Sequence, residues 1–309
     1  MEMRNIGTLP VSVVGLGCNN FGMTIDAEAS RAVVDAALEA GINYFDTADI
    51  YGGGKSEEFL GAALAGNRDR AVIASKFGHA KFLPEGQRGG DPAWIRRCVD
   101  RSLRRLGTDR IDHYQIHTPN PETPQAETLG ALAELVEEGK VLEIGCSNFT
   151  ADLVDASVDA ATEMGVGNYA SVQNHYSVLT RDVEDAGVLA ACGRAGMAVV
   201  PFFPLESGLL TGKYSGAARP DGARLTTMKG RTWERFLREE NLAAVDRLIA
   251  YATERGRSIL ELAMGWLVSN PTVASVICGA TKPSQVAVNV AAAGWTMTSE
   301  QRAEIAALA

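Results

Sequence analysis

The chain has 309 residues, of which 46% are hydrophobic and 22% are charged, and its net charge at pH 7 is −9. This length and composition allow a large buried core and exclude a disordered chain, while the negative charge disfavours binding to nucleic acid or to an anionic membrane. Because the apolar runs are too short to span a bilayer and the amino terminus lacks a signal-peptide pattern, we expect a cytoplasmic protein.

The first eleven residues, MEMRNIGTLPV, contain a Gly-Thr turn and predict a small β-hairpin. After it, short runs rich in β-branched residues alternate with amphipathic segments to the end of the chain, without a linker or a break in composition. We therefore predict a single domain over residues 1–309. Eight strands are predicted, over 13–18, 42–47, 71–76, 111–117, 141–147, 170–176, 197–203 and 275–280.

Amphipathic helices are predicted between these strands, as in DAEASRAVVDAALEAG (26–41), where Gly41 suits the position just past a helix end. The same pattern recurs in SEEFLGAALAG, PAWIRRCVDRSLRRLG and PQAETLGALAELVEEG. Eight strand–helix units can bury every strand on both faces by closing into a barrel, whereas an open doubly wound sheet would leave edges to cover. We therefore predict an α/β fold, a (β/α)8 TIM barrel with a short N-terminal β-hairpin.

Two glycine-rich segments do not match phosphate-binding loops. In VVGLGCNNFG the GxG begins at Gly15, but Asn20 stands where GxGxxG requires its third glycine, and YGGGKS lacks the spacing of GxxxxGK[ST].

The five cysteines are scattered and form no CxxC pair, so neither disulfides nor a metal site is predicted. Cys18, near the predicted barrel mouth, is interpreted as a buried structural thiol, with a redox-sensitive thiol as the alternative.

Four polar residues lie at or just after predicted strand ends, where barrels of this kind carry their chemistry. Asp46 ends the second strand, Tyr51 follows in its loop, and Lys76 and His117 end the third and fourth strands. Each has an ordinary structural explanation alone, but together they suggest catalysis. An ammonium favours an ionised phenol and a carboxylate keeps that ammonium charged, so the set would lower the pKa of the tyrosine toward working pH. Such a set suits carbonyl reduction, for which a nicotinamide must supply the hydride.

Segments along nearly the whole chain resemble the aldo-keto reductase superfamily: GLGCNNFG, GINYFDTADIYGGGKSEEFLGAAL, ASKFG, RSLRRLGTDRIDHYQIH, GKVLEIGCSNF, QNHYS, PLESGLLTGKY and GATKPSQVAVN. The resemblance implies an oxidoreductase that reduces aldehydes or ketones with NADPH, or catalyses the reverse oxidation. It also implies that Asp46, Tyr51, Lys76 and His117 are catalytic, with Tyr51 as the general acid and His117 orienting the carbonyl oxygen.

The resemblance also implies a cofactor site along the barrel mouth. Its nicotinamide carboxamide would be held by Ser147, Asn148 and Gln173, with Phe202 stacked on the ring; the alternative is that Phe202 and its neighbour Phe203 belong to the barrel core. Phe203 stands where the family carries a small polar residue. The remaining implied cofactor residues are Leu205, Ser207, Gly208, Leu210 and Lys213 along the pyrophosphate, and Gly279, Thr281, Lys282, Gln285 and Asn289 toward the adenosine end.

The adenosine end departs from the family pattern at two positions. Many relatives carry Arg or Lys where this chain has Gln285, and Glu where it has Val288. The expected preference for NADPH over NADH therefore follows from the resemblance more than from these residues.

The segment 213–238 carries seven Lys or Arg residues against two acids in an otherwise acidic chain. One interpretation is a solvated surface loop. The other is a flap whose cations, such as Arg219 or Arg224, fold over a bound dinucleotide.

The substrate pocket is predicted from the loops after the first, third and fourth strands, where Phe21, Met23, Phe77, His79 and Phe82 are available as its lining. No long carboxyl-terminal loop follows the last helical pattern, so we expect an open site that accepts bulky or sugar-like carbonyl compounds.

A rival hypothesis is a nucleotide-binding regulatory subunit that acts through a protein partner. An isomerase or lyase without nicotinamide conflicts with Ser147, Asn148 and Gln173. The sequence does not specify an oligomeric state.

Overall fold

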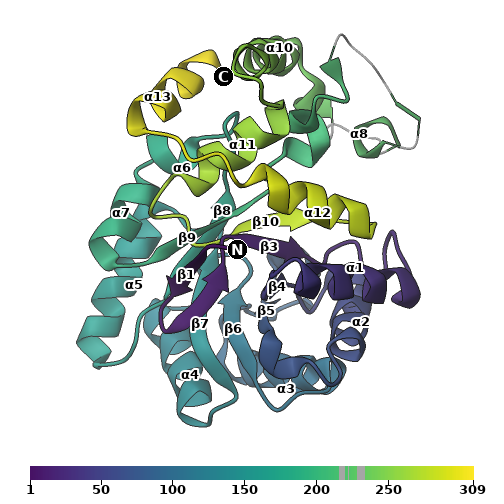
Figure 1. The fold of residues 1–309 in the computed structure, drawn as a ribbon. Helices are drawn as coiled ribbons and strands as arrows, with labels where there is room; N and C mark the ends of the chain where they lie inside the picture. Colours follow the sequence, from purple (N-terminus) through teal and green to yellow (C-terminus); the bar gives the residue numbers. More distant parts are fainter. Residues whose placement is uncertain (216–219, 222, 228–233) are drawn as a thin grey trace.

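The computed structural model of the chain describes residues 1–215, 220–221, 223–227 and 234–309. Eight parallel strands form a nearly closed barrel with helices around its outside (Figure 1). The strands are β3 (Val14–Gly17), β4 (Tyr44–Asp46), β5 (Val72–Phe77), β6 (Ile111–Ile116), β7 (Val141–Ser147), β8 (Ser171–His175), β9 (Ala198–Phe202) and β10 (Val276–Gly279). All eight predicted strands are present, each within two residues of the predicted bounds.

The strands pair in the order β10-β3-β4-β5-β6-β7-β8-β9, so chain neighbours are also neighbours in space. The remaining seam is bridged next to β10. The backbone N–H of Val199 donates to the Thr272 carbonyl at 2.8 Å, and the Val199 carbonyl accepts from Ala274 at 2.9 Å. The predicted barrel is therefore confirmed.

The α-helices cover the barrel in chain order. They are α1 (Ala27–Glu39), α2 (Lys55–Ala63), α3 (Pro92–Leu106), α4 (Gln125–Glu137), α5 (Ala151–Met164), α6 (Asp182–Asp185), α7 (Val188–Ala195), α8 (Arg224–Thr227), α10 (Glu239–Glu254), α11 (Ile259–Val268), α12 (Pro283–Ala292) and α13 (Ser299–Leu308). Local sequence fixes several ends. Asp91 caps the first turn of α3 ahead of Pro92, and Gly41, past the end of α1, has φ +84°.

The predicted N-terminal hairpin is also present, with antiparallel β1 (Met3–Ile6) and β2 (Leu9–Ser12) lying across one end of the barrel (Figure 1). Its turn is held to β7, because the backbone N–H and the hydroxyl of Thr8 both donate to Glu143 Oε1 at 2.7 Å. Apolar hairpin residues such as Ile6 and Val11 are fully buried and join the cluster of interior residues. The hairpin therefore closes the floor of the barrel, opposite the strand ends that carry the site.

Side chains alternate between the barrel interior and the helix layer, as strand geometry requires. In β4, Phe45 joins the large core under the helices, whereas Tyr44 belongs to the interior cluster. In β5, Lys76 lies inside the barrel mouth, and Phe77 after it packs in the outer core against Tyr114, with ring centroids 4.8 Å apart.

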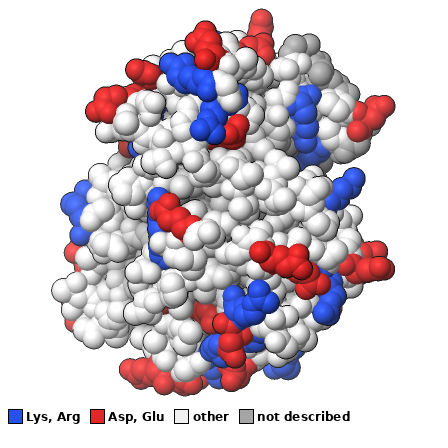
Figure 2. Space-filling view, viewed as in Figure 1, with Lys and Arg blue, Asp and Glu red and all other residues white. Residues whose placement is uncertain are grey.

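The described residues contain no helix long and apolar enough to cross a membrane. On the face shown in Figure 2, acidic and basic side chains are interspersed between wide uncharged areas, and neither sign forms a continuous field.

Candidate active site

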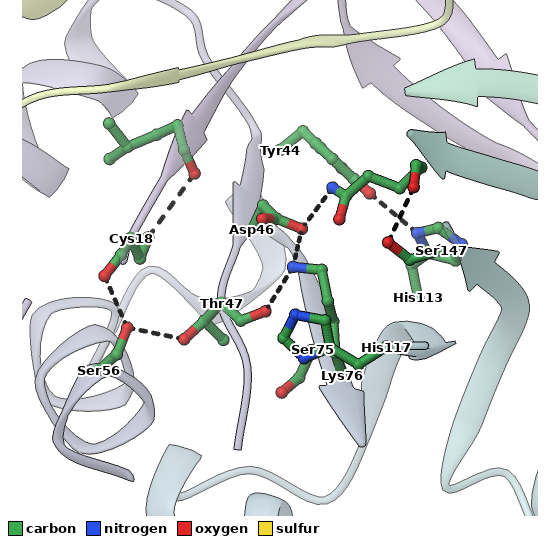
Figure 3. Close-up of polar contacts among 12 residues, drawn as sticks. Cys18, Tyr44, Asp46, Thr47, Ser56, Ser75, Lys76, His113, His117 and Ser147 are labelled. Carbon is green, nitrogen blue, oxygen red and sulfur yellow. Dashed lines mark hydrogen bonds and ion pairs between the residues drawn. The ribbon is translucent and has the colours of Figure 1, made fainter. Parts of the chain in front are cut away.

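Three strand ends bring their polar side chains together inside the barrel mouth. Lys76 Nζ donates to Asp46 Oδ1 at 2.7 Å and to the Thr47 carbonyl at 2.9 Å (Figure 3). From the other side of the barrel, Gln173 Nε2 donates to the same Asp46 oxygen at 2.9 Å. Only 5% of the Asp46 side chain and 1% of the Lys76 side chain are exposed, so the ion pair is shielded from water.

Tyr51 lies beside this pair, at the start of the 3₁₀ turn η1 (Tyr51–Gly54). Lys76 Nζ is 5.2 Å from the centre of the Tyr51 ring. The Tyr51 and His117 rings meet edge to face, with centroids 5.8 Å apart and an interplanar angle of 81°. The structure thus brings together the four residues that the sequence grouped as catalytic.

The protonation of the four residues differs in one respect from the sequence prediction. Burial raises the pKa of Tyr51, and the positive charge of Lys76 only partly offsets this, so the phenol pKa lies above its usual 10 rather than below it. Burial opposes the charged form of Lys76, but Asp46 and Tyr51 outweigh it and hold the lysine pKa above its usual value. At neutral pH, Tyr51 therefore carries its proton beside a charged ammonium, which is the state a proton donor needs.

His117 is held as a neutral imidazole. Burial, followed by the charges of Lys76 and His79, lowers its pKa well below the usual value. Its Nδ1 atom is buried and has no hydrogen-bond partner. The ring of His79 meets it edge to face with centroids 4.7 Å apart. A neutral ring can donate from one nitrogen and accept at the other, so His117 can hydrogen-bond a carbonyl oxygen without competing for the proton of Tyr51.

The structure divides the five predicted pocket residues into two groups. Met23 and Phe82 are exposed by 67% and 61%, and His79 is half-buried next to His117. Phe21 and Phe77 have no exposed surface and pack in the core, so we remove them from the predicted pocket. For Phe77 the cause is strand alternation, because Lys76 faces the barrel interior.

Ser147, Asn148 and Gln173 lie next to one another, as the resemblance implies. Their donors are engaged inside the protein: Ser147 Oγ donates to the Gln173 carbonyl at 2.8 Å, and Asn148 Nδ2 donates to the His117 carbonyl at 3.0 Å. Asn148 has φ +61°, so its backbone turns sharply after β7. Within the described residues, the side-chain oxygens of Asn148 and Gln173 accept no hydrogen bond. Two acceptors are thus left for an amide N–H₂ group.

Phe202, at the end of β9, is partly exposed and stacks on His175, with centroids 5.6 Å apart and an interplanar angle of 19°. Phe203 has φ +52° and meets the Phe202 ring edge to face. Both rings are only partly buried, which disagrees with the alternative that they belong wholly to the core.

The predicted pyrophosphate loop forms the 3₁₀ segment η4 (Glu206–Thr211), in which Ser207 and Gly208 have φ of +57° and +97°. The backbone N–H groups of Gly208 and Leu210 donate to the Leu205 carbonyl at 2.8 and 3.2 Å, so these two predicted anion donors are engaged within the loop. Ser207 Oγ is buried without a partner.

The lysine side chain of Lys213 lies against the same loop. Lys213 Nζ sits 2.8 Å from the position that a Cβ atom on Gly208 would occupy, so the ammonium lies directly against this glycine, whose φ of +97° is in the left-handed region. Burial and, to a lesser extent, the positive charge of Arg224 lower the pKa of Lys213. Arg219 lies outside the described residues.

At the adenosine end, the side chain of Gln285 folds back toward the preceding turn. Gln285 Oε1 accepts from the backbone N–H of Thr281 at 2.7 Å and from its hydroxyl at 3.1 Å. Asn289, one helical turn later, is 7% exposed, whereas Lys282 and Gly279 lie on the surface.

All five cysteines are free and buried. Burial, followed by the charge of Asp46, raises the pKa of the Cys18 thiol well above its usual value, which opposes the reactive thiolate. The interpretation of Cys18 as a structural thiol therefore agrees with the structure.

Two buried carboxylates around the site, Glu206 and Glu57, were not predicted from the sequence. Glu206 is 3% exposed and accepts from His175 Nε2 at 2.9 Å and from the Ser177 hydroxyl. Glu57 is fully buried and pairs with Arg105 at 3.1 Å. The position of Glu57 was open to prediction, because it shares a helix face with Leu60 three residues later. Nothing in the sequence pattern indicates that Glu206 turns inward.

The residues present fit a nicotinamide dinucleotide. Two amide oxygens without donors, a buried hydroxyl without a partner at Ser207, and the cation Lys213 beside Gly208 match a carboxamide and a pyrophosphate. They follow one another along the strand ends from β7 to η4, as an extended ligand would require.

Comparison with known proteins agrees with this geometry. The model of the Aldo/keto reductase family matches residues 13–309. The L-glyceraldehyde 3-phosphate reductase of Escherichia coli (strain K12) is 32% identical over 308 residues, covering 96% of this chain and 88% of that protein. The Aldo-keto reductase YhdN of Bacillus subtilis (strain 168) is 33% identical over 315 residues, covering 99% and 92%. A probable voltage-gated potassium channel subunit beta of Oryza sativa subsp. japonica is 31% identical over 302 residues, covering 94% and 91%.

Proposed function

Because the chain belongs to the aldo/keto reductase family, we propose that it is an NADPH-dependent oxidoreductase that reduces the carbonyl group of an aldehyde, a ketone or a sugar-derived substrate. The reverse oxidation uses the same residues. The observation that carries this proposal is the grouping of Tyr51, His117 and the buried Lys76–Asp46 pair at the barrel mouth. We further propose that residues 1–309 act as one barrel domain.

In the proposed mechanism, Asn148, Gln173 and Phe202 would hold a nicotinamide, which would supply the hydride for the carbonyl carbon. Neutral His117 hydrogen-bonds the carbonyl oxygen and orients it. Tyr51 donates its phenolic proton to that oxygen, and the ammonium of Lys76 stabilises the negative charge that develops on the phenol. Asp46 keeps Lys76 charged and fixed, because the lysine has no other carboxylate partner among the described residues. The reverse reaction needs the same groups, with Tyr51 accepting the proton.

The proposed cofactor site extends from the nicotinamide end at Asn148, Gln173 and Phe202 to Lys213 and then toward Asn289. The proposed flap includes Arg224, which is partly buried at the start of α8 and whose positive charge contributes to the lowered pKa of Lys213. The proposed preference for NADPH rests on family membership. At the adenosine end, Gln285 is already engaged with Thr281 and offers no positive charge to a ribose phosphate.

The experiment for this function measures cofactor oxidation at 340 nm by the native chain. NADPH and NADH are compared across a panel of aldehydes, ketones and sugar-derived carbonyl compounds that spans small and bulky members. We expect turnover with NADPH on at least one class, and the panel shows whether bulky members are accepted. Tight NADPH binding without turnover on any compound would contradict carbonyl reduction.

A regulatory role is the second candidate, because relatives that share the full barrel include proteins named as potassium channel subunits. In that case the chain would bind the dinucleotide, turn it over slowly and associate stably with another protein. Rapid turnover by the isolated chain, without a partner retained on purification, would favour the enzyme.

A further inference from the structure

The loop that carries Tyr51 has little to hold it in place by itself. The three residues after Tyr51 are Gly52, Gly53 and Gly54, with φ of +58°, +67° and +99°. Glycine gains these conformations without strain but leaves the backbone free to move, and it contributes no side chain to packing. Proton transfer requires the phenol to be held within a fraction of an ångström. Within the loop, the backbone N–H of Tyr51 donates to the Ala48 carbonyl at 3.2 Å, so further restraint on the phenol must come from contacts outside the loop.

Arg105, on α3, supplies one such restraint on the loop that carries Tyr51. Its Nη1 donates to the carbonyl of Asp49, two residues before Tyr51, at 3.0 Å. The guanidinium also fills the space next to Gly54, where an added Cβ would lie 2.4 Å from its central carbon. One side chain thus contacts the Tyr51 loop on both sides of the tyrosine.

Glu57, in the first turn of α2, fixes that arginine. Its Oε2 accepts from Arg105 Nη1 at 3.1 Å, and its Oε1 accepts from Ser75 Oγ at 2.6 Å. Ser75 immediately precedes Lys76 in β5, so this carboxylate joins the helix after Tyr51 to the strand that carries the catalytic lysine. No part of the Glu57 side chain is exposed, whereas 25% of the Arg105 side chain is. A buried carboxylate of this kind depends on its cation.

A parallel connection runs along the other side of α2. Ser56 Oγ donates to the Cys18 carbonyl at 2.8 Å and is 2.7 Å from Thr47 Oγ1, while the Thr47 carbonyl accepts from Lys76 Nζ (Figure 3). The first turn of α2 is therefore tied to the strand ends through two adjacent side chains. The connection through Glu57 and Arg105 additionally reaches the Asp49 carbonyl and the backbone at Gly54, one on each side of Tyr51.

We propose that Glu57 and Arg105 are positioning residues that hold Tyr51 in register with Lys76 for proton transfer. Neither residue is part of the proposed contact with substrate or cofactor, and the inference rests on the proposed function. It assigns a role to a buried ion pair on the far side of the loop from the reaction.

The test uses Glu57→Gln and Arg105→Met in the full chain, with Arg104→Met as the control. Arg104 is an exposed neighbour on the same helix and forms no ion pair within the described residues. We expect kcat to fall about 100-fold in both variants, as for an ångström-scale misplacement of a catalytic group. KM for the carbonyl and Kd for NADPH, measured by fluorescence, should change less than about twofold, because neither ligand touches this pair. The control should match the native chain.

Arg105→Lys gives a graded comparison. It keeps the charge but lacks the planar fork that reaches both the Asp49 carbonyl and Glu57, so its kcat should fall between those of the native chain and Arg105→Met. A folded Arg105→Lys or Glu57→Gln variant with native kcat would overturn the proposal. If Glu57→Gln does not fold, the kcat of Arg105→Lys alone tests the proposal.

Hydrogen exchange separates this inference from the proposed function. Amides of the 49–55 segment should exchange faster in Arg105→Met than in Arg104→Met, whatever the activity. If the native chain reduces no carbonyl but exchange still increases in Arg105→Met, then the Glu57–Arg105 pair does anchor the loop and the proposed function fails. If the native chain is active and both exchange and kcat are unchanged in Arg105→Met, the anchor is refuted and the function stands.

Discussion

Replacing Asp46 with Asn removes the negative charge of the buried ion pair in the site. Asp46 Oδ1 accepts from Lys76 Nζ at 2.7 Å and from Gln173 Nε2 at 2.9 Å. Asn has nearly the same shape and can still accept from Gln173, so the main loss is the negative charge opposite a lysine whose side chain is 1% exposed. The substitution therefore tests whether Asp46 keeps Lys76 charged.

The expected free-energy cost of removing the Asp46 charge follows from the burial of the Asp46–Lys76 pair. Removing one partner of a buried ion pair costs about 3–5 kcal/mol, because the other charge is left uncompensated. Lys76 can avoid this cost by losing its proton, so its pKa should fall in the variant. In the native chain Asp46 and Tyr51 outweigh burial and hold the pKa of Lys76 above its usual 10.5; without the Asp46 charge, burial should lower it.

The assay is the pH profile of kcat with saturating NADPH and one good carbonyl substrate. In the native chain the pKa of Lys76 lies above its usual value, so kcat should not fall on account of this lysine at neutral or mildly basic pH. In Asp46→Asn, the decline of kcat with rising pH should begin at a lower pH than in the native chain, because a neutral Lys76 no longer stabilises the charge on Tyr51. A variant profile with native height and shape would refute the assigned role of Asp46.

Further predictions concern stability, cofactor choice and thiol reactivity. Burial and the charge of Glu57 raise the pKa of Asp49 from 3.8 to about 7. The folded chain then binds this proton more tightly than the unfolded chain, so stability should fall by up to about 4 kcal/mol as pH rises from about 4 to 7. Urea titrations of Asp49→Asn should lack this decline, and an identical pH dependence would count against it. Gln285→Arg should lower the Kd for NADPH about tenfold relative to NADH, since a charged hydrogen bond to phosphate becomes available; an unchanged ratio in fluorescence titrations would disprove this. The buried Cys18 should react with a thiol reagent only after unfolding, and rapid labelling of the native chain would contradict its structural role.

The barrel was predictable because each strand–helix unit can be recognised from the pattern of its own residues. Every strand is a short apolar run, every major helix has an apolar face, and strands adjacent in the chain are adjacent in the sheet. The catalytic grouping was predictable for the same reason. Once the strands are parallel and in order, Asp46, Lys76 and His117 at successive strand ends must meet at one mouth.

What escaped prediction depends on the surroundings in three dimensions. The direction of the Tyr51 pKa is a balance between burial and the charge of Lys76, and sequence spacing reveals only the second. The inward turn of Glu206 follows from left-handed loop backbone that no motif indicates for a non-glycine residue. The burial of Phe77 was open to prediction, because placing Lys76 inside the barrel forces the next side chain outward.

The central claim is that Tyr51 is the proton donor of a carbonyl reductase, and Tyr51→Phe tests it most directly. The variant keeps the ring that packs against His117 and lacks only the hydroxyl. The measurement is single-turnover NADPH oxidation with saturating carbonyl substrate, made together with a fluorescence titration of NADPH binding. We predict native NADPH affinity and a rate at least about 100-fold lower, the scale of a lost general acid. Native affinity with an undiminished rate would contradict the assignment of Tyr51 and the mechanism built on it.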